Sequence, residues 1–407
     1  MSKDKAMRAE ETDIAVVGAG PSGLIAAREA AMRGAKVIVF EEHPQIGLPC
    51  HCAGLLSIKG LKEINASPYG DYVQNRVKGA HFFSPSGISF TIEREKPVAC
   101  VVNRRLFDCF LAKQAMKTGS EIRMKSRVQM VKREDGKWLL DIRGRSPVKA
   151  KLLIDAEGSS TRILKMTELK TLETNKLLKG LQTDISGIEL DPEYVEVHFG
   201  NKVAPGFFAW VIPLGDEAAR VGLACRKFRP KDLLFNFIKK RFGDLEKISI
   251  HAFYSGSIIT CGPIKRTYAD GLLVVGDAAG QVKPISGGGV ILGGICASIA
   301  GKVASKAIEL NALEKNFLKN YESEWKEILG REFKVSLFAR KILNLLSDRD
   351  FDKIFSIIGD KEVLHEISVK GDMDMQGTSI LKAFRKKGRI LKFLPIIFGA
   401  VFRGLIG

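Results

Sequence analysis

The amino-acid sequence predicts an α/β protein in which separated parts of the chain build one nucleotide-binding sheet. Three segments support this prediction, because each combines a short apolar run with the glycine and acidic residues of a nucleotide site. They are residues 13–23, 153–162 and 273–280. Apolar runs of this kind suit strands that are buried on both faces of a parallel sheet.

The first segment has the residue order of a dinucleotide-binding turn. Residues 14–17 form the apolar run. Gly18 permits the tight turn that follows it, Gly20 lets the backbone approach a pyrophosphate, and Gly23 lets the next helix pack close to the strand. Ser22 stands at the start of that helix, whose unpaired N–H groups and positive dipole end favour phosphate.

An acidic residue at the expected distance strengthens this interpretation. Residues 22–32 have helical periodicity, and residues 36–40 follow as the second strand. Glu41 ends that strand, close to the spacing of about 20 residues expected for the acid that binds the ribose. Its carboxylate would accept hydrogen bonds from ribose hydroxyls and repel a 2′-phosphate. The alternative is a glycine-rich turn without a ligand, which the combination of strand, helix and acid disfavours.

The length, composition and charge of the chain limit the classes of protein to which it can belong. A length of 407 residues predicts two or three structural units, and an apolar fraction of 45% is ordinary for a globular protein. The net charge of +18 indicates an anionic partner such as phospholipid or nucleic acid, with a generally basic surface as the alternative. Seven cysteines fit a reducing compartment better than a disulfide framework. Residues 1–12 are polar and no uncharged apolar stretch is long enough to span a bilayer, so we expect a cytoplasmic protein.

Periodicity predicts the remaining elements. A hairpin is expected at residues 82–92 and helices at residues 104–117, 231–241 and 290–310; strands are expected at residues 122–131, 138–142, 148–154, 195–199, 207–212, 220–224, 251–257 and 272–275. Residues 167–179 read as a polar crossing segment and residues 313–365 as successive amphipathic helices. The predicted units are a discontinuous nucleotide domain (residues 1–75, 100–168 and 263–310), a β-rich domain (76–99 and 169–262) and a helical C-terminal region (311–407).

Together the three segments resemble the flavoprotein hydroxylase superfamily, whose pattern is GxGxxG, then DGxxSxxR, then GD. The middle segment lacks a literal Asp-Gly start but keeps Asp155, Gly158 and Arg162, and the last segment contains Asp277. The resemblance implies FAD as the cofactor. It also implies a Rossmann-like FAD-binding domain of the glutathione-reductase/hydroxylase type, with a β-rich substrate domain inserted and a helical C-terminal region.

Residues around the last segment are expected to contact the flavin. Asp277 would accept hydrogen bonds from the cofactor, although a helix N-cap is an alternative role. Gly288 and Gly289 would let the backbone lie against a flat ring. Val290 opens a helix whose N-terminus would stabilise reduced flavin. Arg104 would contact the phosphates or the ring, with a solvated surface arginine as the alternative.

Four further segments resemble the geranylgeranyl reductase family, in particular archaeal digeranylgeranylglycerophospholipid reductases. They are a proline–cysteine loop (Pro49, Cys52, Ala53, Gly54), a helix start (Arg104, Phe107, Asp108), a PxxYxWxFP-like stretch (residues 205–213) and a glycine run (residues 284–289). In the third segment Phe208 and Ile212 replace the usual tyrosine and phenylalanine, so no proton-donor role carries over to position 208. The resemblance covers roughly residues 13–301 and weakens beyond them.

The resemblance implies that reduced flavin N5 delivers hydride, with a proton from an unassigned donor, to isoprenoid C=C bonds of geranylgeranyl chains on archaeal ether phospholipids. Positioning and exclusion of water would then dominate catalysis. The expected cofactor-binding residues also include Cys52, Ala53, Leu55 and Val128; the expected substrate-binding residues are Phe208, Trp210 and Pro213.

Cys52 is the one residue to which we assign a catalytic role, as a thiol that orients substrate or relays a proton. The alternative is a small loop cysteine that packs on the cofactor. The run Cys50-His51-Cys52 lacks a second cluster and falls short of a zinc site, so no metal is expected.

The tail predicts a membrane-surface role. After Asp374 there is no acidic residue; the basic residues are Lys382, Arg385, Lys386, Lys387, Arg389, Lys392 and Arg403. Large apolar residues lie among them, and the apolar stretch 393–402 is short and contains Pro395. This composition is typical of a peripheral segment on the anionic inner face of the cell membrane, with a helix docked on the protein itself as the alternative.

Three other functions remain open at this point. A flavin monooxygenase or halogenase would act on an aromatic substrate, but the Trp-x-Trp-x-Ile motif of halogenases is absent. A flavoprotein acting on tRNA would suit the charge, but the basic tail carries aliphatic rather than stacking side chains, so a nucleic-acid partner is disfavoured. A non-catalytic, membrane-docked flavin binder is the third. No second GxGxxG segment is present, so the electron donor is either NADPH or a ferredoxin.

Overall fold

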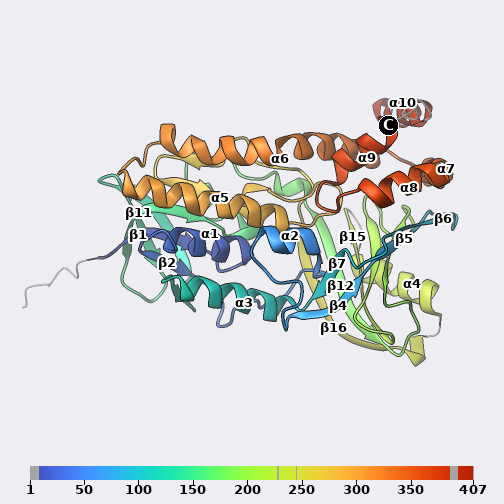
Figure 1. Ribbon diagram of the computed structural model, residues 1–407, viewed down its shortest axis with the longest axis horizontal. Coiled ribbons are helices and arrows are strands. Elements are labelled where there is room, and N and C mark those ends of the chain that lie inside the picture. Colours follow the sequence, from blue (N-terminus) through green and yellow to red (C-terminus); the bar gives the residue numbers. More distant parts are fainter. Residues whose placement is uncertain (1–8, 227–228, 244, 386–392, 407) are drawn as a thin grey trace, which may run out of the picture.

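The computed structural model describes residues 9–226, 229–243, 245–385 and 393–406 (Figure 1). This part of the chain contains three β-sheets, with long helices along one side and short helices at the C-terminal end. Short 3₁₀ turns lie at Gly158–Ser160, Leu164–Met166, Thr174–Lys176, Leu245–Lys247 and Gly276–Ala279.

The first sheet, here called the nucleotide sheet, joins the three segments that the sequence singled out. Its strand order is β17-β18-β11-β1-β2-β8, and β10 and β9 extend it from β11. Its strands are β1 (Glu10–Val17), β2 (Val37–Phe40), β8 (Glu121–Arg123), β9 (Val128–Glu134), β10 (Lys137–Ile142), β11 (Val148–Asp155), β17 (Tyr268–Ala269) and β18 (Leu272–Val274). The five strands from β18 to β8 are parallel, which confirms the predicted α/β class.

One predicted strand of this sheet is wrong. The sequence suggested a single strand over residues 122–131, but the chain turns between β8 and β9. Lys125 has φ 52°, in the left-handed region, and its N–H donates to the carbonyl of His43. This turn depends on a contact with a distant loop, so local periodicity could not reveal it.

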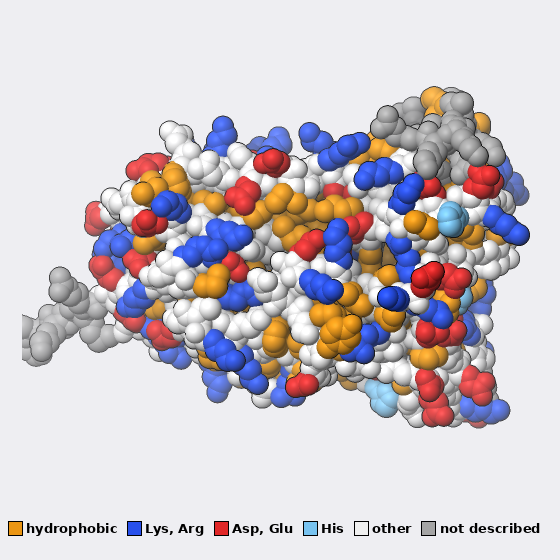
Figure 2. Space-filling model, in the orientation of Figure 1, with side chains coloured by type: hydrophobic (Ala, Val, Ile, Leu, Met, Phe, Trp, Pro, Cys, Tyr) orange, Lys and Arg blue, Asp and Glu red, His pale blue; other side chains and the backbone are white. Residues whose placement is uncertain are grey.

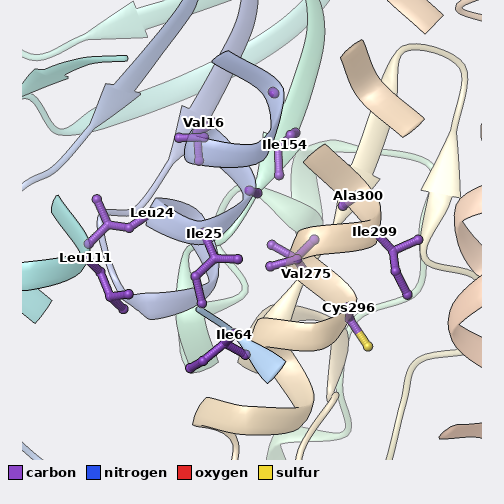
Figure 3. Packing of buried hydrophobic residues seen from close by; sticks show 14 of the residues in the cluster. Val16, Leu24, Ile25, Ile64, Leu111, Ile154, Val275, Cys296, Ile299 and Ala300 are labelled. Atoms are coloured by element: carbon purple, nitrogen blue, oxygen red, sulfur yellow. The ribbon is translucent and has the colours of Figure 1, made fainter. Parts of the chain in front are cut away.

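Helices cover one face of the nucleotide sheet. They are α1 (Pro21–Ala31), α3 (Arg104–Lys117), α5 (Val290–Glu309) and α6 (Lys315–Leu343). Figure 3 shows Val16 of β1 and Ile154 of β11 in the same apolar cluster as Ile25 of α1 and Ala300 of α5. The opposite face packs on β9, β10 and nearby loops through residues such as Phe40.

Small residues bring α5 close to α1. A Cβ atom on Gly301 would lie 2.4 Å from the carbonyl oxygen of Ala26, so only glycine fits this contact. Within the described residues, α5 alone is long and apolar enough to cross a membrane. Its most apolar window is 72% buried inside the protein, as expected of a core helix.

The second sheet, here called the insert sheet, has the strand order β16-β12-β15-β14-β13-β5-β6. Its strands are β5 (Gly79–Phe83), β6 (Ser89–Glu93), β12 (Leu178–Ser186), β13 (Tyr194–Phe199), β14 (Phe208–Pro213), β15 (Ala218–Cys225) and β16 (Ser249–Ile258). Helix α4 (Pro230–Phe242) covers one face. The predicted hairpin at residues 82–92 is present as β5 and β6. The sequence missed β12 because its many polar residues hide its alternation. The predicted domain boundaries stay a prediction.

A small third sheet and the C-terminal helices complete the fold. The sheet contains β3 (Leu55–Ser57), β7 (Ala99–Val102) and β4 (Val73–Val77), and α2 (Ile58–Glu63) follows β3. The last helices are α7 (Asp348–Ile358), α8 (Lys361–Lys370), α9 (Gln376–Arg385) and α10 (Leu394–Ile406). Pro395 lies in the first turn of α10, where proline is tolerated, and so does not interrupt the apolar stretch.

The close packing of α1 on α5 generates the first prediction. Gly301→Ala forces the two helix backbones apart and should lower the free energy of unfolding by about 1–3 kcal/mol. Gly330→Ala is the matched control, because a Cβ there meets its nearest atom, Lys326 Cβ, at 3.5 Å, an ordinary contact. In the control, the better helix propensity of alanine should raise stability by up to about 1 kcal/mol. Urea unfolding of both variants checks this, and equal effects would contradict it.

Candidate flavin and substrate site

The three predicted segments meet where neighbouring strands end together. In register, Val17 of β1 lies opposite both Phe40 of β2 and Asp155 of β11, and Asp155 lies opposite Val274 of β18. The loops after these strands also touch. A Cβ atom on Gly18, which has φ 102°, would lie 2.4 Å from the carbonyl oxygen of Ala156.

The start of α1 leaves open space for an anion. Its N-cap is Gly20, no side chain caps it, and its first turn carries no acidic residue. A Cβ atom on Gly20 would meet nothing within 4 Å, whereas one on Gly23 would lie 2.0 Å from the carbonyl oxygen of Gly18. Gly23 is therefore needed for packing, and Gly20 borders space outside the protein. Ser22 faces the third segment, since its Oγ lies 2.4 Å from the Cβ position of Gly276.

Glu41 lies at the end of β2, beside the glycine turn. Its Oε2 accepts a hydrogen bond from the N–H of Ala19 at 2.9 Å, and its Oε1 accepts one from the N–H of His43 at 2.9 Å. The carboxylate keeps further lone pairs, so it can also accept from ribose hydroxyls. Val128 is only 5% exposed and packs in the core beneath this strand end, in the same cluster as Phe40.

Asp155 is a buried carboxyl group with an unused oxygen. Its Oδ1 accepts from the N–H of Glu157 at 3.0 Å, while its fully buried Oδ2 has no partner among the described residues. Burial, reinforced by the charge of Glu157, raises the pKa of Asp155 well above its ordinary value. Buried polar groups are almost always paired, so this oxygen fits contact with a bound group. Gly158 borders open space, while Arg162 is engaged at the surface by Glu42 at 3.0 Å.

Glu157 is a residue of this loop to which we had assigned no role. Its carboxylate accepts hydrogen bonds from the backbone N–H groups of Arg162, at 2.7 Å, and Leu164, at 2.9 Å. It therefore fixes the loop that carries Gly158. The acidic residue in the Asp-Ala-Glu-Gly sequence was the only local signal of this role.

Asp277 and the glycine run lie against each other. A Cβ atom on Gly289 would lie 2.7 Å from Asp277 Oδ1, and one on Gly288 would lie 2.7 Å from Lys283 Cε. Burial raises the pKa of Asp277, and the positive charge of Arg104 opposes this shift. Asp277 caps no helix, because Val275 is the N-cap of its 3₁₀ turn.

Helix α5 starts at Val290 directly after the glycine run. Its N-cap is Gly289, which offers no side-chain hydrogen bond, and its first turn carries no acidic residue. The first N–H groups and the positive dipole end of this 20-residue helix are therefore available for negative charge. This geometry suits the reduced flavin ring that we expect at the start of α5.

The side chain of Arg104 is only 12% exposed and is engaged by Asp108, so the alternative of a solvated surface arginine is wrong. Its Nε and Nη2 donate to the two carboxylate oxygens of Asp108, each at 3.0 Å. Burial disfavours its charge, but the charge and the hydrogen bonds of Asp108 raise the pKa of Arg104 overall, so it stays protonated. It lies between the cysteine loop and Asp277, close enough to shift the pKa of both Cys50 and Asp277.

The cysteine loop connects Arg104 to the insert sheet. Cys52 is half-buried, and its Sγ accepts from the N–H of Gly54 at 3.4 Å. Arg220 of β15 donates from Nη1 to the carbonyl of Ala53 at 3.0 Å. Ala53 and Leu55 pack with Trp210 in one apolar cluster. The structure thus brings Cys52 to the boundary between the two sheets, and its catalytic role stays a prediction.

An apolar wall on the insert sheet faces the glycine run. It consists of Leu178, Phe207, Phe208, Trp210 and Ile258. Ile258 Cγ2 lies 2.4 Å from the Cβ position of Gly287, and the rings of Phe207 and Phe208 stack at 4.1 Å. Pro213 does not join the wall, because strand alternation places it on the opposite face from Phe208 and Trp210. Phe228, another aromatic residue of the insert, lies outside the described residues.

A buried ion pair beneath the glycine run was missed by the sequence reasoning. Lys283 Nζ lies 3.1 Å from Asp374 Oδ1, and the two side chains are 8% and 5% exposed. Asp374 also accepts from the hydroxyl of Ser57, the N-cap of α2. Asp374 lies 91 residues after Lys283, so no local pattern could have revealed the contact.

Comparison with known proteins agrees with this site. The family model of the geranylgeranyl reductase catalytic domain matches residues 177–258, and that of FAD dependent oxidoreductases matches residues 13–167. The digeranylgeranylglycerophospholipid reductase of Methanocaldococcus jannaschii is 38% identical over 393 residues, which cover 94% of this chain and 97% of that protein. This chain belongs to the geranylgeranyl reductase family. A second relative of the same name, from Methanothermobacter thermautotrophicus, is 34% identical over 86% of this chain and 92% of its own length.

Among solved structures, a reductase-like protein is similar in both sequence and fold, whereas a halogenase is similar in fold alone. A geranylgeranyl bacteriochlorophyll reductase-like protein from Thermoplasma acidophilum superposes with a TM-score of 0.86 at 30% identity, over 95% of this chain and 99% of that chain. The myxobacterial chondrochloren halogenase superposes with a TM-score of 0.66 at 19% identity, over 96% of this chain and 97% of that chain. The halogenase shares the fold alone.

The predicted cofactor and the predicted reductase class are thereby confirmed: the protein is an FAD-dependent oxidoreductase of this family. The site fits FAD on three structural grounds. They are the open space at Gly20, the unpartnered oxygen of Asp155, and the uncapped helix starts of α1 and α5.

The open space at Gly20 generates the second prediction. Gly20 has φ −74° and ψ 176°, which alanine adopts without strain, so Gly20→Ala should fold normally. Its new methyl group would occupy the space of the pyrophosphate and should weaken FAD binding at least about tenfold, or about 1.4 kcal/mol. Gly215→Ala, which also adds a methyl group in open space but on the insert domain, is the control. Titration of FAD-free protein with FAD measures the affinity. Unchanged FAD affinity in Gly20→Ala would place the phosphates elsewhere.

Proposed function

We propose that this protein reduces C=C bonds in the geranylgeranyl chains of glycerophospholipids at a membrane surface. The substrate class is taken from the names of its relatives, which cover almost the whole chain. The observation that carries the proposal is the apolar wall beside the glycine run, where Ile258 and Phe207 approach Gly287. A wall of this kind suits a long hydrocarbon chain laid against the flavin site.

When bound and reduced, FAD would supply the hydride that the alkene receives. The chain's own residues position both partners and exclude water from them. The glycine run and the start of α5 support one side of the site, and the rings of Phe208 and Trp210 form the other. An unactivated alkene gains most from such positioning and from a dry site. Cys52 would orient the substrate or relay a proton, a role supported by its position at the boundary between the two sheets.

The third prediction tests the reaction. FAD-loaded protein reduced with dithionite under nitrogen should convert a geranylgeranyl lipid to products heavier by whole pairs of hydrogen atoms, measured by mass spectrometry. Oxidised protein is the control and should give no product. A protein that takes up no FAD would refute the flavin site. An oxygenated product formed only with oxygen and NAD(P)H would instead indicate a monooxygenase.

The C-terminal helices offer a surface suited to a membrane. We define the tail surface by its exposed apolar side chains: Phe338 of α6, Leu345 in the turn after α6, Ile380 of α9, and Leu394 and Phe398 of α10. Along α6, Lys334, Phe338 and Lys341 follow one exposed stripe at helical spacing, and Leu345 is exposed just beyond the end of the helix. Figure 2 shows Lys and Arg side chains bordering the region of these helices. Basic and large apolar side chains on one face are typical of binding to an anionic leaflet.

The other face of α10 packs on the protein. Ile396 and Ala400 are buried against Phe351 and Phe355 of α7. Docking on the body and exposure to a membrane are therefore compatible, because they use opposite faces of the helix. Of the tail residues that suggested this role, Lys386, Lys387, Arg389 and Lys392 lie outside the described residues, as does the side chain of Arg385. We propose that the protein lies on the cytoplasmic face of the cell membrane through this surface.

The fourth prediction tests the tail surface. Phe398, which is 68% exposed, should insert into the interface, so Phe398→Ser should weaken binding to anionic phospholipid vesicles at least about tenfold. Met116→Ser, at a 51% exposed position on α3 away from the tail, is the matched control. Vesicle co-sedimentation measures the affinity. Binding to tRNA in the same assay, with no vesicle binding by the wild type, would reject the membrane role.

A further inference from the structure

A small cavity lies at one end of the apolar wall. Its volume is about 30 Å³, and it is lined by the insert sheet, the glycine run and helices α6 and α7. Its principal lining side chains are Phe199, Phe207, Phe208, Ile285, Leu343 and Arg340. Asn201 and Asn344 also line the cavity, and Arg340 is the one lining residue that carries a charge.

Arg340 is buried without an acidic partner. It is 4% exposed, and among the residues that the structure describes no carboxylate lies within ion-pair distance of it. Its Nη2 donates to the carbonyl oxygen of Gly206, and its Cζ lies 5.0 Å from the ring centre of Phe207. Its Nε is buried and has no hydrogen-bond partner in the described part of the chain.

The buried acids nearest in sequence are engaged elsewhere. Glu332, on the same helix, accepts hydrogen bonds from the N–H groups of Gly377 and Thr378 at the start of α9. Asp350 accepts from Ser347 and forms an ion pair with Arg403. The charge of Arg340 is therefore balanced by neither of these carboxylates.

The charge of Arg340 persists despite its burial. Burial, reinforced by the nearby charge of Arg226, lowers the pKa of Arg340 to about 10. Even so, the guanidinium is protonated at neutral pH. A buried, unpaired cation is unfavourable and is normally matched by an anion. Arg226 adds positive charge near Arg340, so this region suits a negatively charged group such as a phosphate monoester.

The position of Arg340 links the flavin site to the tail surface. The ring of Phe207 lies between Arg340 and the glycine run, with its Cζ atom 3.7 Å from the Cβ position of Gly287. On the other side, Phe199 and Leu343 of the cavity belong to the same apolar cluster as Ile396 and Ala400 of α10. A lipid that arrives at α10 and reaches the apolar wall would pass Arg340.

We propose that Arg340 binds the phosphate of the lipid substrate and so selects chains that carry an anionic head group. This inference rests on the proposed function, since it assigns a head-group subsite to the same reaction. Nε and the remaining N–H groups would donate to phosphate oxygens, in the planar geometry that makes arginine a common phosphate ligand. The hydrocarbon would extend from this point along Phe207 and Phe208.

The experiment uses full-length, FAD-loaded, oxidised protein and measures equilibrium binding, so it does not require turnover. The probes are digeranylgeranylglycerol phosphate and uncharged digeranylgeranylglycerol. Arg340→Gln should lose at least about ten times more affinity for the phosphate lipid than for the uncharged lipid. Arg340→Lys should recover part of the loss because it keeps the charge. Arg349→Gln, at an exposed arginine of α7, is the control and should show no such difference.

Other outcomes would overturn the proposal. Equal losses for both lipids in Arg340→Gln would show that Arg340 only maintains the shape of the loop at Gly206. Binding of inorganic phosphate that depends on Arg340 but does not compete with the phosphate lipid would show a separate anion site. The proposed reductase function fails independently, if reduced wild-type protein converts neither lipid while the difference in binding persists.

Discussion

The site depends on one constraint, the shared register in which β2, β1, β11 and β18 end. Phe40, Val17, Asp155 and Val274 lie side by side across these strands, so four loops leave the sheet at one level. A shift of one residue in any strand would turn buried side chains toward the wrong face of the sheet. The same shift would carry a loop away from its neighbours. The core and the cofactor site are therefore fixed by the same hydrogen-bond ladder.

Backbone contacts then set the distances between these loops. Gly18 approaches Ala156, and Gly276 approaches Ser22, at separations that exclude a side chain. The Lys283–Asp374 ion pair connects these loops to the segment that precedes α9. Because both side chains are buried, removal of one partner would leave an uncompensated charge beside the glycine run. The tail is thus coupled structurally to the flavin side of the site.

The sequence predicted what depends on neighbours in the chain and missed what depends on distant partners. The strand–helix–strand unit with Glu41 was predicted because its periodicity and glycines are local, and the helix at residues 104–117 was found with its observed bounds. The split of residues 122–131 and the polar strand β12 were not found, since both are settled by contacts across the fold. Likewise, nothing near Arg340 in the sequence shows that it is buried without an acid.

The distribution of polar groups constrains where a proton can enter. No side chain of the apolar wall can donate a proton to carbon at neutral pH, and Phe208 stands where the family usually has a tyrosine hydroxyl. The cysteine loop, whose Ala53 packs with Trp210 of the wall, carries the thiol of Cys52 close to the cationic groups of Arg104 and Arg220. A proton supplied by the protein would therefore reach the alkene from the cysteine loop and not from the aromatic rings of the wall.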